Sequence, residues 1–519
     1  MSNQRQSCFG CVDHSKQNKT HNPGAITQMA KPSRVTSALS LKVVLFLAIT
    51  AVVANRAAAQ ASGGFQSSQP SNTAASIAQI ASAGGWDTSL TLVNLSTFPV
   101  GTVLNFYDNS GNPLSLPFSF PQGTMSAMTN STVNGSITAS GLLLVDTTGL
   151  YTQPANVGWS RLQASGEVGG YALFTNTRTN WQAAVPMQTL NASSYLLAFD
   201  NTGALSTGVA IANLATQDAN INAIIRDDGG NIIGTESISV PAQGHTSFTM
   251  SSTYPVTAGM RGTVEFDTPA GGQINVLGLR ANGPALTTVP VLADVGTAGG
   301  SMAHLTYSQG WETTFTLVNT GTSSAQATLS FFDDFGTPLG VSMIFPQTGT
   351  LANSTTVTKT LAPGASLIVE TNGNDNYKSV SGSALLTTTG NVSGFAVFRF
   401  DPSQQEAVVP LETRNASSYT VVYDNSNGNA TGLALANASD QAETLSLILR
   451  DETGAQFAGG SVTLAAHGHT ALTMSEAYPG TEGIRGTVQI SNLAGTPFSA
   501  LGIRFTPSQN ITTIPVLAK

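Results

Sequence analysis

Two cysteines and six histidines are the residues of this 519-residue chain best suited to metal binding or thiol chemistry. Cys8 and Cys11 have the spacing of a zinc-ligand pair, and His14 and His21 follow nearby. No His directly follows Cys11, so the haem-attachment signature is absent. All four residues precede a predicted export signal, and we therefore expect none of them to act in the mature protein.

The export signal is predicted from the apolar run 43–54, which follows several basic residues and precedes a small-residue cleavage site at 57–59. This run is too short to span a bilayer, which takes about 20 residues. We expect residues 1–59 to be a signal peptide region and residues 60–75 a flexible polar linker. Either Met29 is the functional start, or the signal has an unusually long basic region.

Charge is scarce in this chain, because only 9% of its residues are charged. Removing the seven basic residues and the one acidic residue of 1–59 from totals of 20 and 28 leaves 13 against 27, a net charge of −14. Nucleic-acid binding needs clustered cations, so we expect no nucleic-acid partner. We also expect no transmembrane anchor after cleavage of the signal.

The remaining histidines could form a metal site only if several of them converge. His245 and His469 occupy equivalent Gly-His-Thr sequences between alternating strand-like runs. His467 and His469 could share one face of a strand, but no third ligand is apparent for them or for His304. We interpret these histidines as solvated turn residues, and we expect no metal and no cofactor.

Sequence motifs for catalysis are missing as well. The chain has no G-x-S-x-G elbow, no phosphate-binding loop and no cysteine after residue 59. Acidic residues recur, but they recur in sequences typical of turns. We therefore expect a protein that is not an enzyme.

Internal repeats define the organisation of the chain. The sequence GGWDTSLTLVN at 84–94 returns as QGWETTFTLVN at 309–319, an offset of 225. Each half divides again, because every quarter contains a strand-like run closed by Asn and ends in Val/Ile-Pro. These residues are Asn94, Asn213, Asn319 and Asn437, with Pro186, Pro290, Pro410 and Pro515. We predict modules A1 (76–190), B1 (191–296), A2 (297–414) and B2 (415–519), although an A and a B module could share one larger core.

Fourteen residues after each of these asparagines, a D-x-x-G sequence begins. The four pairs are Asp108 with Gly111, Asp227 with Gly230, Asp333 with Gly336, and Asp451 with Gly454. An Asp that accepts backbone N–H bonds, followed by a Gly with positive φ, is typical of a hairpin turn. A calcium loop would need more carboxylates at alternating positions, so we interpret these sites as structural turns.

The local pattern is that of strands. Leu445, Leu447 and Leu449 alternate with polar residues, and similar period-two runs occur in every quarter. The Ala-rich stretch 74–80 is the only one for which a helix remains an alternative to a strand. The pattern predicts an all-β chain of tandem β-sandwich modules, immunoglobulin-like by pattern alone, in an A-B-A-B arrangement after a signal peptide.

The Gly-Trp-x-Thr-x-x-x-Leu-Val-Asn sequence at 85–94 and 310–319 resembles one in secreted, largely uncharacterised bacterial β-repeat proteins. The resemblance covers the two A modules best. It implies an exported, surface-associated β-protein, and it carries no activity and no functional residues with it.

Arginines at equivalent positions are the most informative charged residues. The pairs are Arg226 with Arg450, Arg261 with Arg485, and Arg280 with Arg504. We expect them to be structural, pairing with turn carboxylates such as Asp227 or Asp451 or capping strand-edge carbonyls. Alternatively, a row of arginines could recognise an acidic polysaccharide.

Trp86 and Trp311 are also equivalent, at the start of each A module. They could stack on sugar rings as ligand-binding residues, or they could plug the end of a sandwich.

The leading interpretation of the whole chain is a secreted or cell-surface, non-enzymatic structural or adhesive protein. An extracellular carbohydrate-binding array is the first alternative, and an exported hydrolase is the second. Partners would be extracellular polysaccharide or other surface proteins, and the location extracellular, cell-surface or periplasmic.

Overall fold

A computed structural model describes residues 73–189, 192–292, 299–374, 376–414 and 416–519. The predicted signal peptide, Cys8, Cys11 and most of the predicted linker lie outside these residues. The linker prediction is wrong at its end, because strand β1 begins at Thr73. The predicted module boundaries fall outside the strands, between Pro186 and Ser194, between Val289 and Gly299, and between Pro410 and Ser418.

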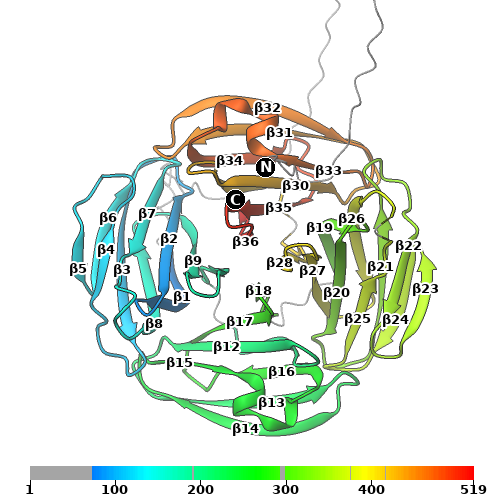
Figure 1. Cartoon of the computed structure of the whole chain (residues 1–519), viewed down its shortest axis with the longest axis horizontal. Helices are drawn as coiled ribbons and strands as arrows, with labels where there is room; N and C mark the ends of the chain where they lie inside the picture. Colours follow the sequence, from blue (N-terminus) through cyan, green and yellow to red (C-terminus); the bar gives the residue numbers. More distant parts are fainter. Residues whose placement is uncertain (1–72, 190–191, 293–298, 375, 415) are drawn as a thin grey trace, which may run out of the picture. The chain divides into compact units, whose positions relative to one another are not determined.

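Module A1 consists of two facing antiparallel sheets (Figure 1). Its strands are β1 (Thr73–Ser82), β2 (Trp86–Asn94), β3 (Val100–Asp108), β4 (Leu116–Ser119), β5 (Met128–Asn130), β6 (Thr132–Ile137), β7 (Leu142–Thr147), β8 (Asn156–Ala164), β9 (Val168–Asn176) and β10 (Trp181–Pro186). The strand orders are β1-β8-β3-β6 and β10-β9-β2-β7-β4-β5.

Module B1 also contains two sheets, ordered β11-β16-β13-β14 and β15-β12-β17-β18. Its elements are β11 (Ser194–Asp200), β12 (Leu205–Asn213), β13 (Ala219–Asp227), β14 (Ile232–Val240), β15 (His245–Thr249), the short helix α1 (Met250–Thr253), the 3-10 turn η1 (Pro255–Thr257), β16 (Arg261–Asp267), β17 (Ile274–Asn282) and β18 (Ala285–Val289).

Module A2 repeats the strand order of A1, with sheets β19-β26-β21-β24 and β28-β27-β20-β25-β22-β23. Its strands are β19 (Gly299–Tyr307), β20 (Trp311–Asn319), β21 (Ala325–Phe332), β22 (Val341–Phe345), β23 (Thr350–Ser354), β24 (Thr356–Leu361), β25 (Ser366–Thr371), β26 (Val380–Thr388), β27 (Val392–Phe400) and β28 (Gln405–Pro410).

Module B2 repeats the order of B1 and adds a short strand, giving β37-β29-β34-β31-β32 and β33-β30-β35-β36. Its elements are β29 (Ser418–Asp424), β30 (Ala430–Asn437), β31 (Glu443–Asp451), β32 (Gln456–Leu464), β33 (His469–Thr473), α2 (Met474–Ala477), η2 (Pro479–Thr481), β34 (Arg485–Asn492), β35 (Phe498–Phe505), β36 (Ile511–Ile514) and β37 (Leu517–Ala518).

The prediction of tandem β-sandwich modules in an A-B-A-B arrangement is confirmed. The strand connections are not those of an immunoglobulin constant domain, in which the first two strands pair. Here β11 pairs with β16, and β12 pairs with β15 and β17. The likeness to immunoglobulin domains therefore extends to the two-sheet architecture alone.

The stretch 74–80, for which the sequence left a helix open, belongs to β1. From Ala75 to Ser82 every residue of this strand is buried, so the usual alternation of apolar and polar residues is lost. One reason is that β1 also contacts β12 and β17 of module B1. The amide of Asn275 on β17 donates to the hydroxyl of Ser76 at 2.9 Å.

Hydrophobic cores continue across all four junctions between modules. The A1 core includes Leu277 of B1, and the B1 core includes Phe395 of A2. The A2 core includes Leu501 of B2, and a fifth cluster joins Val422 of B2 to Tyr171 of A1. The modules therefore do not bury their cores independently of one another.

Contacts between edge strands close this series into a cycle. Strand β10 contacts β18, β18 contacts β28, β28 contacts β36, and β36 contacts β10. Figure 1 labels three of these strands, β18, β28 and β36, near the centre of the view. Each of these four strands ends at, or just before, the Val/Ile-Pro sequence of its module. The region where they meet is the candidate functional site.

Candidate functional site

The D-x-x-G sequences form tight turns at the junctions between modules. Asp108 Oδ1 accepts hydrogen bonds from the backbone N–H groups of Ser110 (2.8 Å) and Asn112 (2.9 Å). Gly111 has a φ of +83° and donates its N–H to the carbonyl oxygen of Asp108. The same arrangement recurs at Asp227, Asp333 and Asp451. Each carboxylate thus accepts bonds from the backbone of its own turn.

Each turn also packs against the next module. A Cβ atom placed on Gly111 would lie 2.0 Å from the carbonyl oxygen of Ala242 in B1. The equivalent distances are 2.4 Å from Gly230 to Pro363, 1.8 Å from Gly336 to Ala466 and 2.1 Å from Gly454 to Ala139. Glycine therefore serves two purposes here, because it provides the positive φ and allows two backbones to approach closely.

One backbone hydrogen bond is repeated at all four junctions. In each case the second residue of the turn accepts an N–H from the next module. The bonds run from His245 to Asn109 (3.2 Å), from Ser366 to Asp228 (3.0 Å), from His469 to Asp334 (3.1 Å) and from Leu142 to Glu452 (2.9 Å). The last of these joins module B2 to module A1 and closes the cycle.

The interpretation of the histidines as solvated turn residues is wrong for three of them. His245, His469 and His304 are buried, with at most 3% of their surface exposed. His245 Nδ1 lies 2.8 Å from Asn109 Oδ1 of A1, and His469 Nδ1 lies 2.8 Å from Asp334 Oδ1 of A2. These two histidines are part of the junctions that receive the turns of the A modules.

His304 extends the second of these contacts into the A2 core. Its Nδ1 lies 3.1 Å from His469 Nε2, so His304, His469 and Asp334 form a chain of polar contacts. Burial, reinforced by the neighbouring His469, holds the pKa of His304 well below its usual value. Burial also lowers the pKa of His245 to about 4.

His467 contacts Asp440 and its ring stacks on that of Phe332, so it does not pair with His469.

Two of the recurring arginines, Arg226 and Arg450, pair with acceptors other than the turn carboxylates Asp227 and Asp451. Arg226 bonds Glu265 at 3.1 Å and Arg450 bonds Gln489 at 3.2 Å, so Asp227 and Asp451 are not their partners.

Arg261 pairs with Asp200 at 2.8 Å, whereas Arg485 lies 3.5 Å from Asp424 and bonds Ser426. These arginines hold strands of one B module together rather than forming a row on the surface.

Arg280 and Arg504 instead reach across junctions. Arg280 Nε of B1 lies 2.9 Å from Glu406 Oε2 of A2, a carboxylate that is only 1% exposed. Arg399 of A2 lies 3.7 Å from the other oxygen of Glu406. The buried acid is therefore compensated by two guanidinium groups.

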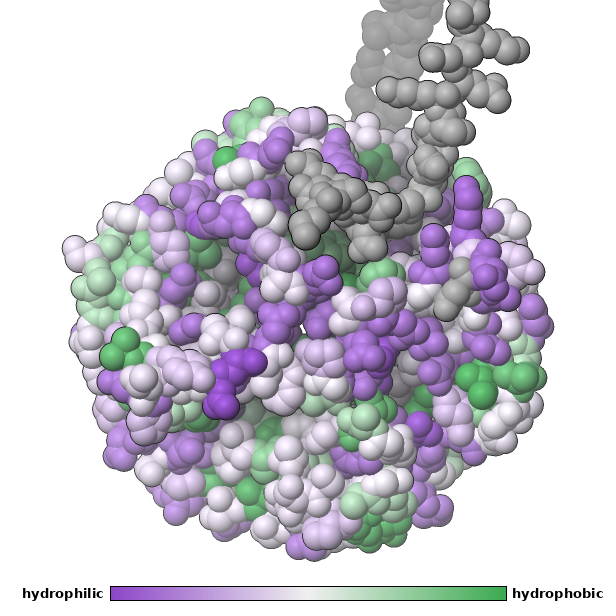
Figure 2. All heavy atoms as spheres, viewed as in Figure 1, coloured by the Kyte–Doolittle hydropathy of each residue, from purple (hydrophilic) through white to green (hydrophobic). Residues whose placement is uncertain are grey.

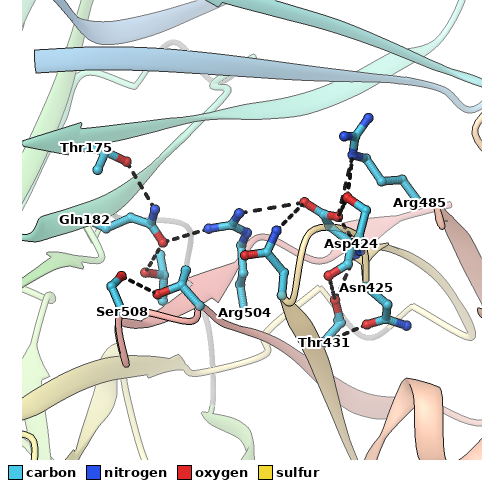
Figure 3. A network of polar contacts seen from close by, with 12 residues as sticks. Thr175, Gln182, Asp424, Asn425, Thr431, Arg485, Arg504 and Ser508 are labelled. Carbon is cyan, nitrogen blue, oxygen red and sulfur yellow. Dashed lines mark hydrogen bonds and ion pairs between the residues drawn. The ribbon is translucent and has the colours of Figure 1, made fainter. Parts of the chain in front are cut away.

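The equivalent junction between B2 and A1 is built without a buried acid (Figure 3). Gln182 replaces Glu406 in the repeat, and its Oε1 accepts a bond of 3.1 Å from Arg504. Its Nε2 donates to Thr175, the residue equivalent to Arg399. Arg504 also lies 3.7 Å from Asp424. One junction thus has an Arg–Glu–Arg group where the other has Thr–Gln–Arg.

The four Val/Ile-Pro sequences converge, which the sequence did not predict. Together with neighbouring residues they line one cavity of about 180 Å³. Its lining includes Pro186, Pro290, Pro410 and Pro515, one from each module. Ala184, Thr288, Val408 and Thr513, at equivalent places two residues before the prolines, line it as well. The four prolines occupy the same position in each repeat. This pattern would have predicted their convergence only if the modules had been known to form a closed cycle.

Trp86 and Trp311 are half-buried against the cores of their own modules. The ring of Trp86 lies 5.3 Å from that of Phe174, and the ring of Trp311 lies 4.6 Å from that of Phe400. This packing favours the structural role over the sugar-stacking role. Larger exposed aromatic surfaces occur at other residues, among them Tyr151, which is 59% exposed.

The asparagines that close the strand-like runs have a role that the sequence analysis missed. Asn94 is buried, and its Nδ2 donates to the carbonyl oxygens of Phe98, Ile137 and Thr138. Asn213, Asn319 and Asn437 make equivalent bonds in their modules. The sequence signal for this role was the recurrence of Asn at the same position of every repeat, because few other side chains both donate and accept hydrogen bonds.

Within the described ranges, no group of three or more His, Cys, Asp or Glu side chains is placed to hold a metal ion. The helices of the same residues are all too short to cross a bilayer. Compared with known proteins, the chain matches no protein-family model and no curated protein.

Proposed function

We propose that this protein is a secreted or cell-surface, non-enzymatic structural or adhesive protein whose four modules act as one rigid scaffold. The observation that carries the proposal is the repeated junction, in which each D-x-x-G turn is docked against the next module. A scaffold that must keep its loops in fixed positions benefits from such closure. A linear spacer does not need it, because its end modules would lie apart.

Closure also answers a problem that export would create. Extracellular proteins commonly gain stability from disulfides, yet this sequence has no cysteine after residue 59. The shared cores and the backbone bond between Leu142 and Glu452 link the end modules without a covalent bond. We infer that this non-covalent closure replaces disulfides as the source of stability outside the cell.

Adhesive contact would involve loops and polar faces rather than one apolar patch. Figure 2 shows one face, on which hydrophobic residues form separate small patches among polar ones. The most exposed large hydrophobic residues, Leu493 and Phe335, belong to different modules. This distribution favours many weak contacts over a single apolar interface.

Fractionation of native cells tests the proposal. We expect the protein in the envelope or the medium, and we expect mass spectrometry to place its N-terminus near Gln60. Recovery of the uncleaved chain from the cytosol would overturn the proposal. Turnover of an ester, glycoside or peptide substrate, if abolished by one point substitution, would establish a hydrolase instead.

A carbohydrate-binding role is the second candidate, and the exposed Tyr151 is the observation that favours it. Arg178 lies over its ring at 6.0 Å, and both residues are close to Gly85 beside Trp86. A glycan array separates this candidate from the first. Saturable binding lost in Tyr151→Ala, a variant outside the core, would support sugar recognition. Loss in Trp86→Ala alone would carry less weight, because Trp86 also packs against Phe174.

A further inference from the structure

The cavity where the four edge strands meet has an unusual chemical lining. Its walls come from all four modules and consist mainly of Val, Leu, Ala, Pro and Thr side chains. Among the described residues that line it, none is charged, and Gln188 is the one with a side-chain amide. The cavity is therefore built for contact with apolar groups.

Three of the four threonine hydroxyls in this lining, those of Thr288, Thr512 and Thr513, are already engaged in hydrogen bonds. Thr288 Oγ1 donates to the carbonyl oxygen of Ala184, across the junction between B1 and A1. Thr513 Oγ1 donates to the carbonyl oxygen of Val408 (2.6 Å) and accepts its N–H (2.9 Å). Thr512 Oγ1 bonds Gln182 at 3.0 Å. These three hydroxyl groups connect modules, and each already has a hydrogen-bond acceptor within the protein.

The prolines remove further hydrogen-bond donors from the walls. Pro186, Pro290, Pro410 and Pro515 have no backbone N–H, and each stands at the end of an inner edge strand. Proline at an edge also opposes the addition of another strand. An extended peptide is thus a poor occupant, and so is a sugar, whose hydroxyls would lose hydrogen bonds to water.

We propose that this cavity is a binding site for one small, uncharged apolar molecule, of the size of an aromatic ring or a short alkyl chain. Its volume supports this size, because an engineered apolar cavity of about 150 Å³ in another protein binds benzene or xenon. The ligand would contact all four modules at once, and its binding would stabilise the closed cycle.

Calorimetric titration of the purified full-length protein with benzene and with phenol tests the proposal. We expect saturable binding of one benzene molecule per chain. Phenol should bind at least tenfold more weakly, because its hydroxyl would lose hydrogen bonds to water in this cavity. Absence of benzene binding, or equal affinity for phenol, would overturn the proposal.

Two substitutions in the lining, with one control outside it, locate the binding. Ala184→Leu fills the cavity and should abolish benzene binding, whereas Ala270→Leu, at an exposed turn of B1, should leave it unchanged. If Ala184→Leu does not fold, Val408→Ala provides an independent test. This variant enlarges the cavity, so it should bind naphthalene more tightly than the unmodified protein does. Unchanged benzene affinity in a folded Ala184→Leu, or unchanged naphthalene affinity in Val408→Ala, would show that the ligand binds elsewhere.

Discussion

The backbone N–H of Leu142 in the first module donates a hydrogen bond of 2.9 Å to the carbonyl oxygen of Glu452 in the fourth. Beside it, Thr138 Oγ1 donates to the carbonyl oxygen of Thr453, across 315 residues of sequence. These bonds make the junction between the ends of the chain equivalent to the three junctions between consecutive modules. The protein is thus held together by four similar contacts.

Substitution of Gly454 should weaken this closing junction. In Gly454→Ala the new Cβ would lie 2.1 Å from the carbonyl oxygen of Ala139, so one backbone must move. Gly495 is a matched control, because it also has positive φ but has no neighbour within 4 Å of an added Cβ. Both variants incur the conformational cost of about 1–2 kcal/mol for a left-handed Ala. We expect a clearly lower melting temperature for Gly454→Ala than for Gly495→Ala, and equal values would argue against tight docking of the turn.

Loss of the buried amide in Asn319→Asp should destabilise module A2. Asn319 Nδ2 donates to the carbonyl oxygens of Ser323 and Leu361, each at 2.9 Å. Aspartate has the same shape but cannot donate, so two acceptors would lose their partner at about 1–3 kcal/mol each. Asn134→Asp, at an exposed position of β6, is the control. Denaturant unfolding should show a lower midpoint for Asn319→Asp alone, and comparable midpoints would contradict the bridging role.

Stability should fall with acid because of the buried histidines. Burial lowers the pKa of His245 to about 4 in the folded state, whereas an unfolded His titrates near 6.5. Above pH 6.5 both states are neutral, so the group has no effect. Between 6.5 and 4 only the unfolded state takes up the proton, and stability falls by an amount on the order of 3 kcal/mol. Below pH 4 both states are protonated, and the loss levels off.

His304 should act in the same direction, because its pKa is also lowered. Melting temperatures measured from pH 8 to 4 should therefore vary less in His245→Gln and His304→Gln than in the unmodified protein. His467→Gln is the control, since His467 is partly exposed and contacts Asp440. A pH dependence unaffected by either of the first two substitutions would contradict the assignment.

Replacement of Glu406 should be costly although Gln182 occupies the equivalent position. Glu406→Gln leaves Arg280 and Arg399 without the buried carboxylate that both approach. Breaking a buried ion pair of this kind costs roughly 3–5 kcal/mol, less whatever the glutamine hydrogen bonds retain. Adding Arg399→Thr reproduces the Thr–Gln–Arg group of the other junction, and we expect it to restore part of the loss. The control is Glu482→Gln, at an exposed site. If the double variant had a lower free energy of unfolding than Glu406→Gln, the two junctions would not be equivalent.

The fold class and the modular organisation could be predicted from the sequence. Alternation in runs such as Leu445, Leu447 and Leu449 reports burial on one face, and tandem duplication leaves recognisable repeats. Strand β1 shows the limit of this reasoning, because burial on both faces removes the alternation. The periodicity of a strand reports how many of its faces are buried, but it does not reveal which module covers them.

The sequence by itself determined that the chain is built from strands, that it repeats in four quarters, and that Asp and Gly form turns at equal positions. Only the tertiary structure decided that Gly111 docks against Ala242, that His469 is buried beside His304, and that four prolines line one cavity. The physical reason is that turn formation and strand periodicity depend on neighbours in sequence. Closure of the cycle depends instead on how each module is rotated against the next, and this rotation is set by contacts such as those of Arg280 with Glu406 and of Arg504 with Gln182, which join residues more than a hundred positions apart.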